Sequence, residues 1–342
     1  MNIRHLGIWL GIFLLLVSCK EEDARMIVCW GDSLTAPHTG DGWKGNIKYL
    51  LMGDNSYPAV LQSNLGNGYR IVNAGVGGEN TLTIMARQGA FPMELAHDVV
   101  IYNDEYKKYD KFLGNKDVPA FRSSYNGKTI TPLLQRGWKE KSPAKVNPSQ
   151  ICGKEYMLES ESHFWTEEGE YIFEYNYFIN PRGEAERTDT LKEGSVIQTY
   201  AMRHLREAYA NVFFMGQNGG FEDVADLIRQ YQAMITYSQS DKFIIIGYHT
   251  PNKVTPTVQR MEEMEDSLQQ AFGDHYINLR NYMVNYGLKD ASFNPTQADL
   301  DSIAKGKVPP QLVPDGCHFT SVGYRLLARL VEKRMKLLNY IK

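Results

Sequence analysis

The sequence predicts an α/β fold of three layers, in which a parallel sheet lies between two layers of helices and a mostly β subdomain is inserted. Two observations predict this fold. Short apolar runs alternate with segments of helical period in the first and last parts of the chain, which is typical of a parallel sheet covered on both faces. From about residue 98 to residue 199 the helical period fades and β-like runs replace it.

The strands of the parallel sheet are recognised as short apolar runs that end at glycine or polar residues. The clearest is residues 243–248, where three isoleucines follow Phe243. Strands are expected at residues 26–30, 69–74, 211–215, 243–248 and 275–279. Helices are expected at residues 57–65, 80–87, 221–237, 259–272 and 320–341. Thr320 is expected to cap the amino end of the last helix.

The inserted segment has its own pattern. Its β-like runs are residues 128–133, 151–158, 162–166 and 170–178. Tyr171, Phe173, Tyr175 and Tyr177 fall at alternate positions, and a period of two places them on one face of a strand. Two interpretations stay open for these aromatic side chains: a small core of the subdomain, or a platform on which sugars stack.

The amino-terminal residues have the pattern of an export signal. Arg4 and His5 precede an apolar run of about a dozen residues, which is short for a membrane span and typical of a signal peptide. The run ends in Leu-Val-Ser-Cys at residues 16–19, which resembles the lipobox of bacterial lipoproteins. The resemblance implies cleavage before Cys19, a lipid on its thiol and anchoring in a membrane. An ordinary secretory signal is the alternative.

The residues after Cys19 bear on the location. Lys-Glu-Glu-Asp at residues 20–23 is similar to the surface-export signal of Bacteroidota lipoproteins, and a solvated tether is the alternative. We expect a bacterial outer-membrane lipoprotein that faces the cell surface or the periplasm. The expected organisation is a signal peptide at 1–18, a tether at 19–25, the α/β domain at 26–97 and 200–342, and the insertion at 98–199.

Charge and cysteine content exclude some classes of protein. The formal net charge is −3 and no basic block occurs, so nucleic acid is not expected as a partner. Cys29, Cys152 and Cys317 lie far apart without metal-ligand spacing, which predicts neither a zinc site nor a disulfide framework. A Cys29–Cys317 pair stays open for an exported chain. The histidines expected to be structural are His38, His97, His249 and His275.

Four short segments carry polar or glycine residues at places where an α/β fold builds its sites. Gly-Asp-Ser-Leu at residues 31–34, Asn-Ala-Gly-Val-Gly-Gly-Glu at 73–79 and Gly-Gln-Asn-Gly at 216–219 each follow an expected strand. Asp-Gly-Cys-His at 315–318 precedes the last helix. A carboxylate and an imidazole three residues apart in a tight turn can form the hydrogen bond that orients a catalytic base.

The four segments, in this order, resemble the SGNH subgroup of the GDSL hydrolases. The resemblance covers roughly residues 26–90, 205–250 and 310–340 and implies a flavodoxin-like SGNH hydrolase fold. It implies that Ser33 is the nucleophile, that His318 is the base oriented by Asp315, and that Ser33, Gly78 and Asn218 form the oxyanion hole.

Two details of the resemblance stay open. Gly77 is the alternative to Gly78, because the two glycines are adjacent. Gly219 follows Asn218 where many members of the family have Asp, which is expected to alter loop geometry and not the chemistry.

These expectations together describe a serine esterase that needs no metal or organic cofactor. The export signal, the long aromatic insertion and a sequence without a long apolar lid favour an acetylesterase acting on acetylated carbohydrates. A lipolytic esterase or thioesterase is one alternative, and a surface glycan-binding protein with an idle triad is another. The expected partners are the ester substrate and, through Cys19, a membrane. The sequence leaves the oligomeric state open.

Overall fold

The computed structural model describes residues 24–36, 55–101, 112–115, 117–132, 146–167, 170–182 and 189–342; of residues 161–167 and 170–174 only the backbone is described. The expected signal peptide, Cys19 and His38 lie outside these residues. Within the described ranges no helix is long and apolar enough to cross a membrane.

A parallel sheet of five strands forms the centre of the molecule, in the order β13-β12-β11-β1-β2. Its strands are β1 (Arg25–Gly31), β2 (Tyr69–Gly75), β11 (Ala210–Phe214), β12 (Phe243–Ile246) and β13 (Tyr276–Ile277). Numbered along the chain within this sheet, the order is 2-1-3-4-5, which is the flavodoxin-like order. Because the order reverses between β1 and β11, their carboxyl ends flank the crevice where such folds bind ligands.

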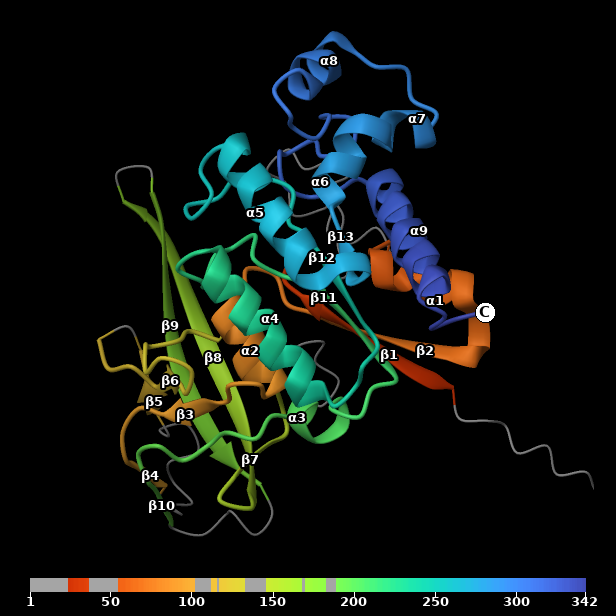
Figure 1. The fold of residues 1–342 in the computed structure, drawn as a ribbon. Helices are drawn as coiled ribbons and strands as arrows, with labels where there is room; N and C mark the ends of the chain where they lie inside the picture. Colours follow the sequence, from red (N-terminus) through yellow and green to blue (C-terminus); the bar gives the residue numbers. More distant parts are fainter. Residues whose placement is uncertain are drawn as a thin grey trace, which may run out of the picture.

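Helices cover both faces of this sheet (Figure 1). On one face lie α1 (Tyr57–Leu65) and α9 (Ser321–Leu337). On the other lie α2 (Thr81–Gln88), α4 (Val224–Ser238) and α5 (Val258–Phe272). The shorter helices are α3 (Tyr200–His204), α6 (Leu279–Tyr282), α7 (Leu288–Asp290) and α8 (Gln297–Ile303). The three-layer α/β fold that the sequence predicts is therefore confirmed.

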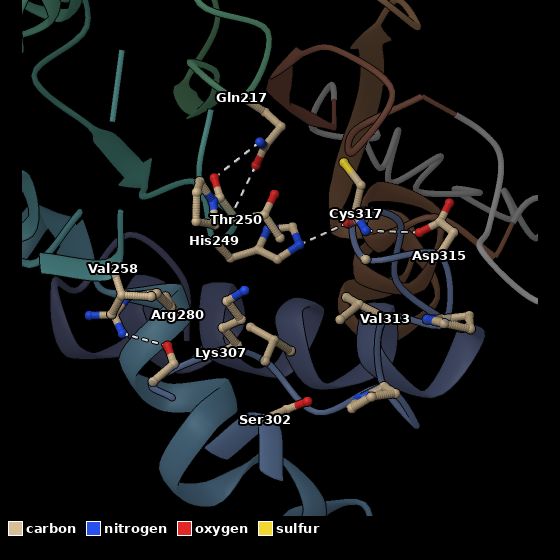
Figure 2. Close-up of a pocket in the computed structure, with 16 residues that line it drawn as sticks. Gln217, His249, Thr250, Val258, Arg280, Ser302, Lys307, Val313, Asp315 and Cys317 are labelled. Carbon is tan, nitrogen blue, oxygen red and sulfur yellow. Dashed lines mark hydrogen bonds between the residues drawn. The ribbon is translucent and has the colours of Figure 1, made fainter. Parts of the chain in front are cut away.

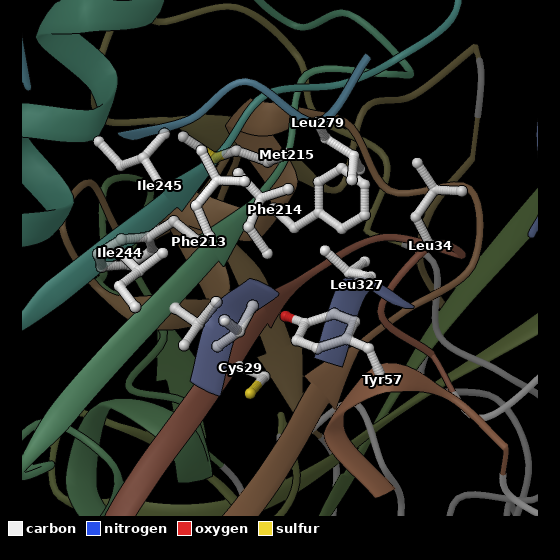
Figure 3. Packing of buried hydrophobic residues seen from close by; sticks show 14 of the residues in the cluster. Cys29, Leu34, Tyr57, Phe213, Phe214, Met215, Ile244, Ile245, Leu279 and Leu327 are labelled. Atoms are coloured by element: carbon white, nitrogen blue, oxygen red, sulfur yellow. The ribbon is translucent and has the colours of Figure 1, made fainter. Parts of the chain in front are cut away.

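The burial of the central strands explains why they appear in the sequence as continuous apolar runs. All five residues of β11 are buried, because both faces of a central parallel strand are covered. Phe214 packs edge-on against Tyr57 of α1, with ring centroids 6.3 Å apart. Figure 3 shows Tyr57 and Leu327, from the two helices of one face, packed close to Cys29 of β1. The expected N-cap is also present, since the Thr320 side chain accepts the backbone N–H of Gly323.

The inserted segment is antiparallel. A four-stranded sheet has the order β5-β9-β8-β7, and two small pairs join β3 to β6 and β4 to β10. The strands are β3 (Met93–Leu95), β4 (Val99–Ile101), β5 (Phe112–Gly114), β6 (Phe121–Ser123), β7 (Ser149–Ile151), β8 (Lys154–Glu167), β9 (Glu170–Pro181) and β10 (Asp189–Leu191). The long β8–β9 hairpin stands beside the α/β core in Figure 1. The mostly β character expected for this segment is thus observed.

The insertion rests on the α/β domain through α2. Its buried side chains form a second apolar cluster that includes Leu82 and Ala86 of α2. Tyr177 is part of this cluster, packs edge-on against Phe121 at 5.1 Å, and donates its hydroxyl to the Pro132 carbonyl. For Tyr177, therefore, the core interpretation of the aromatic row is the one that the structure supports.

Some expected elements are shorter than predicted: β12 ends at Ile246 and not at residue 248, α4 begins at Val224 and not at residue 221, and α9 ends at Leu337 and not at residue 341.

Three other expected elements differ from those observed for reasons that the structure shows. Residues 128–133 form no strand in their described part, only an isolated bridge between Arg122 and Thr129, because a turn precedes it. The expected strand at 151–158 is broken at Cys152, whose positive φ of 50° turns the chain from β7 into β8. The last strand ends at Ile277 and not at residue 279, because Asn278 caps α6.

Candidate active site

Ser33 lies in a tight turn directly after β1, at the crevice. The Asp32 carbonyl accepts the backbone N–H groups of Thr35 and Ala36 at 3.1 and 2.9 Å, which bends the chain away from the strand. Gly31 allows this bend, since a Cβ there would lie 2.2 Å from the Thr35 hydroxyl and 2.5 Å from the Phe214 carbonyl oxygen. The turn leaves the Ser33 side chain only partly buried.

The structure brings Ser33, His318 and Asp315 into one hydrogen-bonded chain. His318 Nε2 lies 2.9 Å from Ser33 Oγ, although 285 positions separate the two residues. His318 Nδ1 lies 2.7 Å from Asp315 Oδ2. A proton on Nδ1 that is donated to the carboxylate leaves Nε2 free to accept the serine proton, which is the arrangement of a nucleophile, a base and an orienting acid.

The turn at 315–318 is held by Asp315 itself. Asp315 Oδ1 accepts the backbone N–H groups of Cys317 at 2.9 Å and His318 at 2.7 Å. Burial acts to raise the pKa of Asp315, but the His318 side chain and these N–H groups prevail and lower it to about 2. The carboxylate is therefore charged at neutral pH and can stabilise an imidazolium.

His249 supports the same turn, which the sequence did not reveal beyond the expectation that this histidine is structural. It follows β12, is 1% exposed, and its Nε2 lies 2.8 Å from the Cys317 carbonyl oxygen. Its ring lies against Phe319 with centroids 4.3 Å apart. Burial lowers the pKa of His249 to about 4, so the ring is neutral at physiological pH and Nε2–H donates to this carbonyl.

The glycine-rich segment after β2 turns at Gly78. Gly78 has φ of +83°, in the left-handed region that favours glycine. Within the described residues, the backbone N–H groups of Ser33 and Gly78 have no hydrogen-bond partner. The same is true of Gly77, so it stays as the alternative donor.

Asn218 forms hydrogen bonds with both the turn after β1 and the glycine-rich segment after β2. Its Nδ2 donates to the Glu79 carbonyl oxygen at 3.0 Å and to Asp32 Oδ2 at 3.3 Å. Burial raises the pKa of Asp32 to about 7, against the lowering effect of the Leu34 backbone N–H and of His318. To donate to an oxyanion, Asn218 would give up the longer of its two contacts, the one to Asp32.

Glu79, whose backbone carbonyl accepts the Asn218 amide, also forms a buried ion pair through its side chain. Arg87 and Glu79 are each 2% exposed at the side chain, and Arg87 Nη2 lies 2.7 Å from Glu79 Oε2. The Arg87 guanidinium also lies over the Trp30 ring at 5.6 Å. No sequence pattern predicts this pair, since eight positions separate the residues and a helix begins between them.

The other candidate residues are accounted for by local structure. His97 Nε2 lies 2.9 Å from the Leu113 carbonyl and His275 Nδ1 lies 3.0 Å from that of Phe243. Both are structural contacts. The free cysteines of the described chain are Cys29, Cys152 and Cys317. Burial raises the pKa of Cys317 to about 12, so its thiol stays protonated at neutral pH and is a poor nucleophile. Among the described residues no His, Cys, Asp and Glu cluster could hold a metal ion.

Comparison with known proteins adds little to this geometry. No protein-family model matches the chain, and no curated protein matches it. One solved structure is similar over 92% of this chain and 99% of the other, with 12% identity and a TM-score of 0.40. A peptidoglycan O-acetylesterase structure is similar over 92% of this chain and 91% of the other, with 13% identity and a TM-score of 0.36. TM-scores this low carry no argument, so the fold assignment rests on the observed sheet order and its two helical layers.

Proposed function

We propose that the protein is a serine esterase of the SGNH hydrolase type, with Ser33 as nucleophile. The observation that carries the proposal is the continuous chain from Ser33 Oγ through His318 to Asp315, with distances of 2.9 and 2.7 Å. Its place at the carboxyl ends of β1 and β11 is where this class of α/β fold binds ligands.

In the first step Ser33 Oγ attacks the carbonyl carbon of the ester while His318 Nε2 takes the hydroxyl proton. Asp315 holds the imidazole in the right tautomer and stabilises its positive charge. The backbone N–H groups of Ser33 and Gly78 and the Asn218 amide donate to the developing oxyanion. The intermediate collapses as His318 returns the proton to the departing alkoxide, which leaves an acyl group on Ser33 Oγ.

In the second step a water molecule takes the place of the alcohol. His318 removes one of its protons, and the resulting hydroxide attacks the acyl carbonyl carbon. The same donors hold the second oxyanion. When this intermediate collapses, the bond to Ser33 Oγ breaks and His318 gives the proton back to that oxygen. The acid is released and the enzyme returns to its starting state without any change in redox state.

The substrate that we propose is an acetyl ester on a carbohydrate, met outside the cell by a lipoprotein anchored through Cys19. The support is the export pattern of residues 1–23 and the mostly β insertion, where Tyr175 lines a cavity of about 360 Å³. Beside it lie the polar side chains of Asn115, Thr129 and Thr131 and the apolar ones of Pro119, Ala120 and Ile130, with the core residue Tyr177 at the base. Neutral polar groups beside aromatic rings suit sugars better than fatty chains.

The deciding experiment uses a purified chain of residues 20–342 and p-nitrophenyl acetate, with acetate release from a panel of acetylated polysaccharides measured in parallel. Ser33→Ala should lower kcat by about a thousandfold or more, because it removes the nucleophile. Unchanged thermal unfolding would show that the variant is folded. Labelling of Ser33 by an alkyl fluorophosphonate, found by peptide mass spectrometry, tests the nucleophile independently of the substrate.

The outcomes separate the alternatives. Equal inertness of the wild type and of Ser33→Ala, with no label on Ser33, would overturn the esterase and favour a surface glycan-binding protein. Faster hydrolysis of long acyl chains than of acetate would favour a lipolytic esterase, and preference for thioesters would favour a thioesterase.

A further inference from the structure

A cavity of about 630 Å³ lies beside the proposed active site (Figure 2). Two of its walls come from the segments that carry the site. One contains Gln217, the neighbour of Asn218, and Thr250; the other is the stretch from Asp315 to Cys317, which ends next to His318. The volume is in the range of pockets that bind small molecules or a few sugar residues.

The remaining walls are mostly apolar and come from the segment that leads into the first turn of α5 and from the end of α8 and the chain that follows it. The apolar residues that line the cavity are Pro251, Val258, Val308, Pro310, Val313 and Pro314. Such walls pack against the C–H faces of a ligand and leave its specificity to the few polar groups.

The charged groups of the lining differ in whether they are neutralised. Arg280 is paired with Glu265, with Nε 2.6 Å from Oε1, and it donates to the Gly306 carbonyl oxygen at 2.8 Å. Asp315 is paired with His318, and in Figure 2 its carboxylate points away from Lys307.

Lys307 is the charged residue of the lining that is not neutralised by an ion pair within the described chain. Its side chain reaches into the cavity toward His249 (Figure 2). No carboxylate of the described residues lies within 4.0 Å of its amine. Lys307 is exposed to solvent, and its positive charge has no ion-pair partner in the described part of the chain. A carboxylate is the complementary ligand group.

The chemistry places the alcohol half of the ester on this side. His318 must deliver a proton to the departing alkoxide oxygen, so the alcohol lies next to His318 when the bond breaks. Since Asp315, Gly316 and Cys317, which directly precede His318, form a wall of the cavity, a group attached to that alcohol is the part of the substrate that the cavity can reach.

We propose that this cavity binds a carboxylate-bearing sugar of the acetylated glycan, and that Lys307 selects it by an ion pair. The inference rests on the proposed esterase function and names its substrate class: an O-acetylated polymer with uronic-acid or similar acidic units. The amide of Gln217 and the hydroxyl of Thr250 would accept or donate hydrogen bonds at the sugar ring, and Lys307 would determine specificity without taking part in the chemistry.

The test compares two acetylated polymers, an acidic polygalacturonate and a neutral xylan. Lys307→Gln should raise KM for the acidic polymer by about tenfold, the change expected for one charge-assisted contact, and change KM for the neutral polymer much less. Lys305→Gln is the matched control, because Lys305 is exposed and carries the same charge as Lys307 but does not line the cavity.

Equal effects of the two substitutions on the acidic polymer would overturn the proposal, since they would reflect only the overall charge of the surface. Equal KM values for both polymers in the wild type would also overturn it. Failure of the esterase proposal itself is distinguishable, because it appears as inertness toward p-nitrophenyl acetate. In that case calorimetric titration of Ser33→Ala with non-acetylated oligogalacturonate, with and without Lys307→Gln, still decides whether the cavity binds acidic sugars.

Discussion

Arg87 and Glu79 provide a sharp test of how the interior supports the site. Both side chains are 2% exposed and joined at 2.7 Å, and the Glu79 backbone carbonyl holds the Asn218 amide at 3.0 Å. Arg87→Met keeps much of the side-chain volume but leaves Glu79 as an unpaired buried carboxylate. Breaking a buried pair on one side costs about 3–5 kcal/mol, so the free energy of unfolding should fall by that amount.

The pKa of Glu79 determines how the stability lost in Arg87→Met should change with pH. Burial already raises the pKa of Glu79, against the lowering effect of Arg87, and removal of Arg87 should raise it further. A carboxyl group whose pKa is higher in the folded than in the unfolded state binds more protons when folded, so stability falls as pH rises. The loss in Arg87→Met should thus be large at about pH 8 and smaller near pH 5.

The assay is urea denaturation of the wild type, Arg87→Met and the double variant Glu79→Leu/Arg87→Met, with kcat for p-nitrophenyl acetate measured on each. The double variant has no buried charge at this place and should recover most of the lost stability. A fall of less than about 1 kcal/mol in the free energy of unfolding of Arg87→Met would refute the reasoning. So would a double variant that is no more stable than Arg87→Met and whose stability depends on pH to the same extent. A fall of kcat in Arg87→Met without a change of KM would indicate that the pair also positions Asn218.

Two further predictions concern other parts of the chain. His249→Gln retains a donor for the Cys317 carbonyl but removes a group whose pKa burial lowers from 6.5 to about 4. As the pH falls from about 6.5 to about 4, His249 of the unfolded wild type binds a proton, whereas His249 of the folded protein does not. The variant should therefore lose less stability than the wild type between about pH 7 and pH 4.5, by up to about 3 kcal/mol, in urea titrations; identical pH dependence would contradict this. Cys19→Ser should move the full chain from the membrane to the soluble fraction of its cells, and unchanged fractionation would disprove lipid anchoring at Cys19.

Much of the fold could be predicted because strands and helices of a doubly wound sheet are local patterns. The five residues of β11 are all buried, so the strand reads as an apolar run without knowledge of its neighbours. The capping Thr320 acts on the Gly323 N–H three residues away and is likewise visible in the chain. By contrast, the break of the expected strand at Cys152 depends on a positive φ at a residue type that rarely adopts one.

The contacts of the candidate site also divide into those that the sequence could predict and those that it could not. The contact of Asp315 with His318 spans three residues of one turn, so the spacing was enough to predict it. The contact of His318 with Ser33 spans 285 positions, and only the family resemblance, not any local pattern, suggested it. The support by His249 and the cation of Lys307 had no sequence signal, because isolated His and Lys residues are common at structural and surface positions.

The sequence by itself determined the alternation of strands and helices, the residues at the strand ends and the Asp315–His318 turn, because each of these depends on neighbours within a few positions. Only the tertiary structure decided that the ends of β1 and β11 meet this turn, since that contact depends on the order in which the strands pair. It likewise decided which charges are buried as a pair and which, like Lys307, face a cavity without a partner in the described chain. Packing sets those environments, and packing is a property of segments that the sequence keeps far apart.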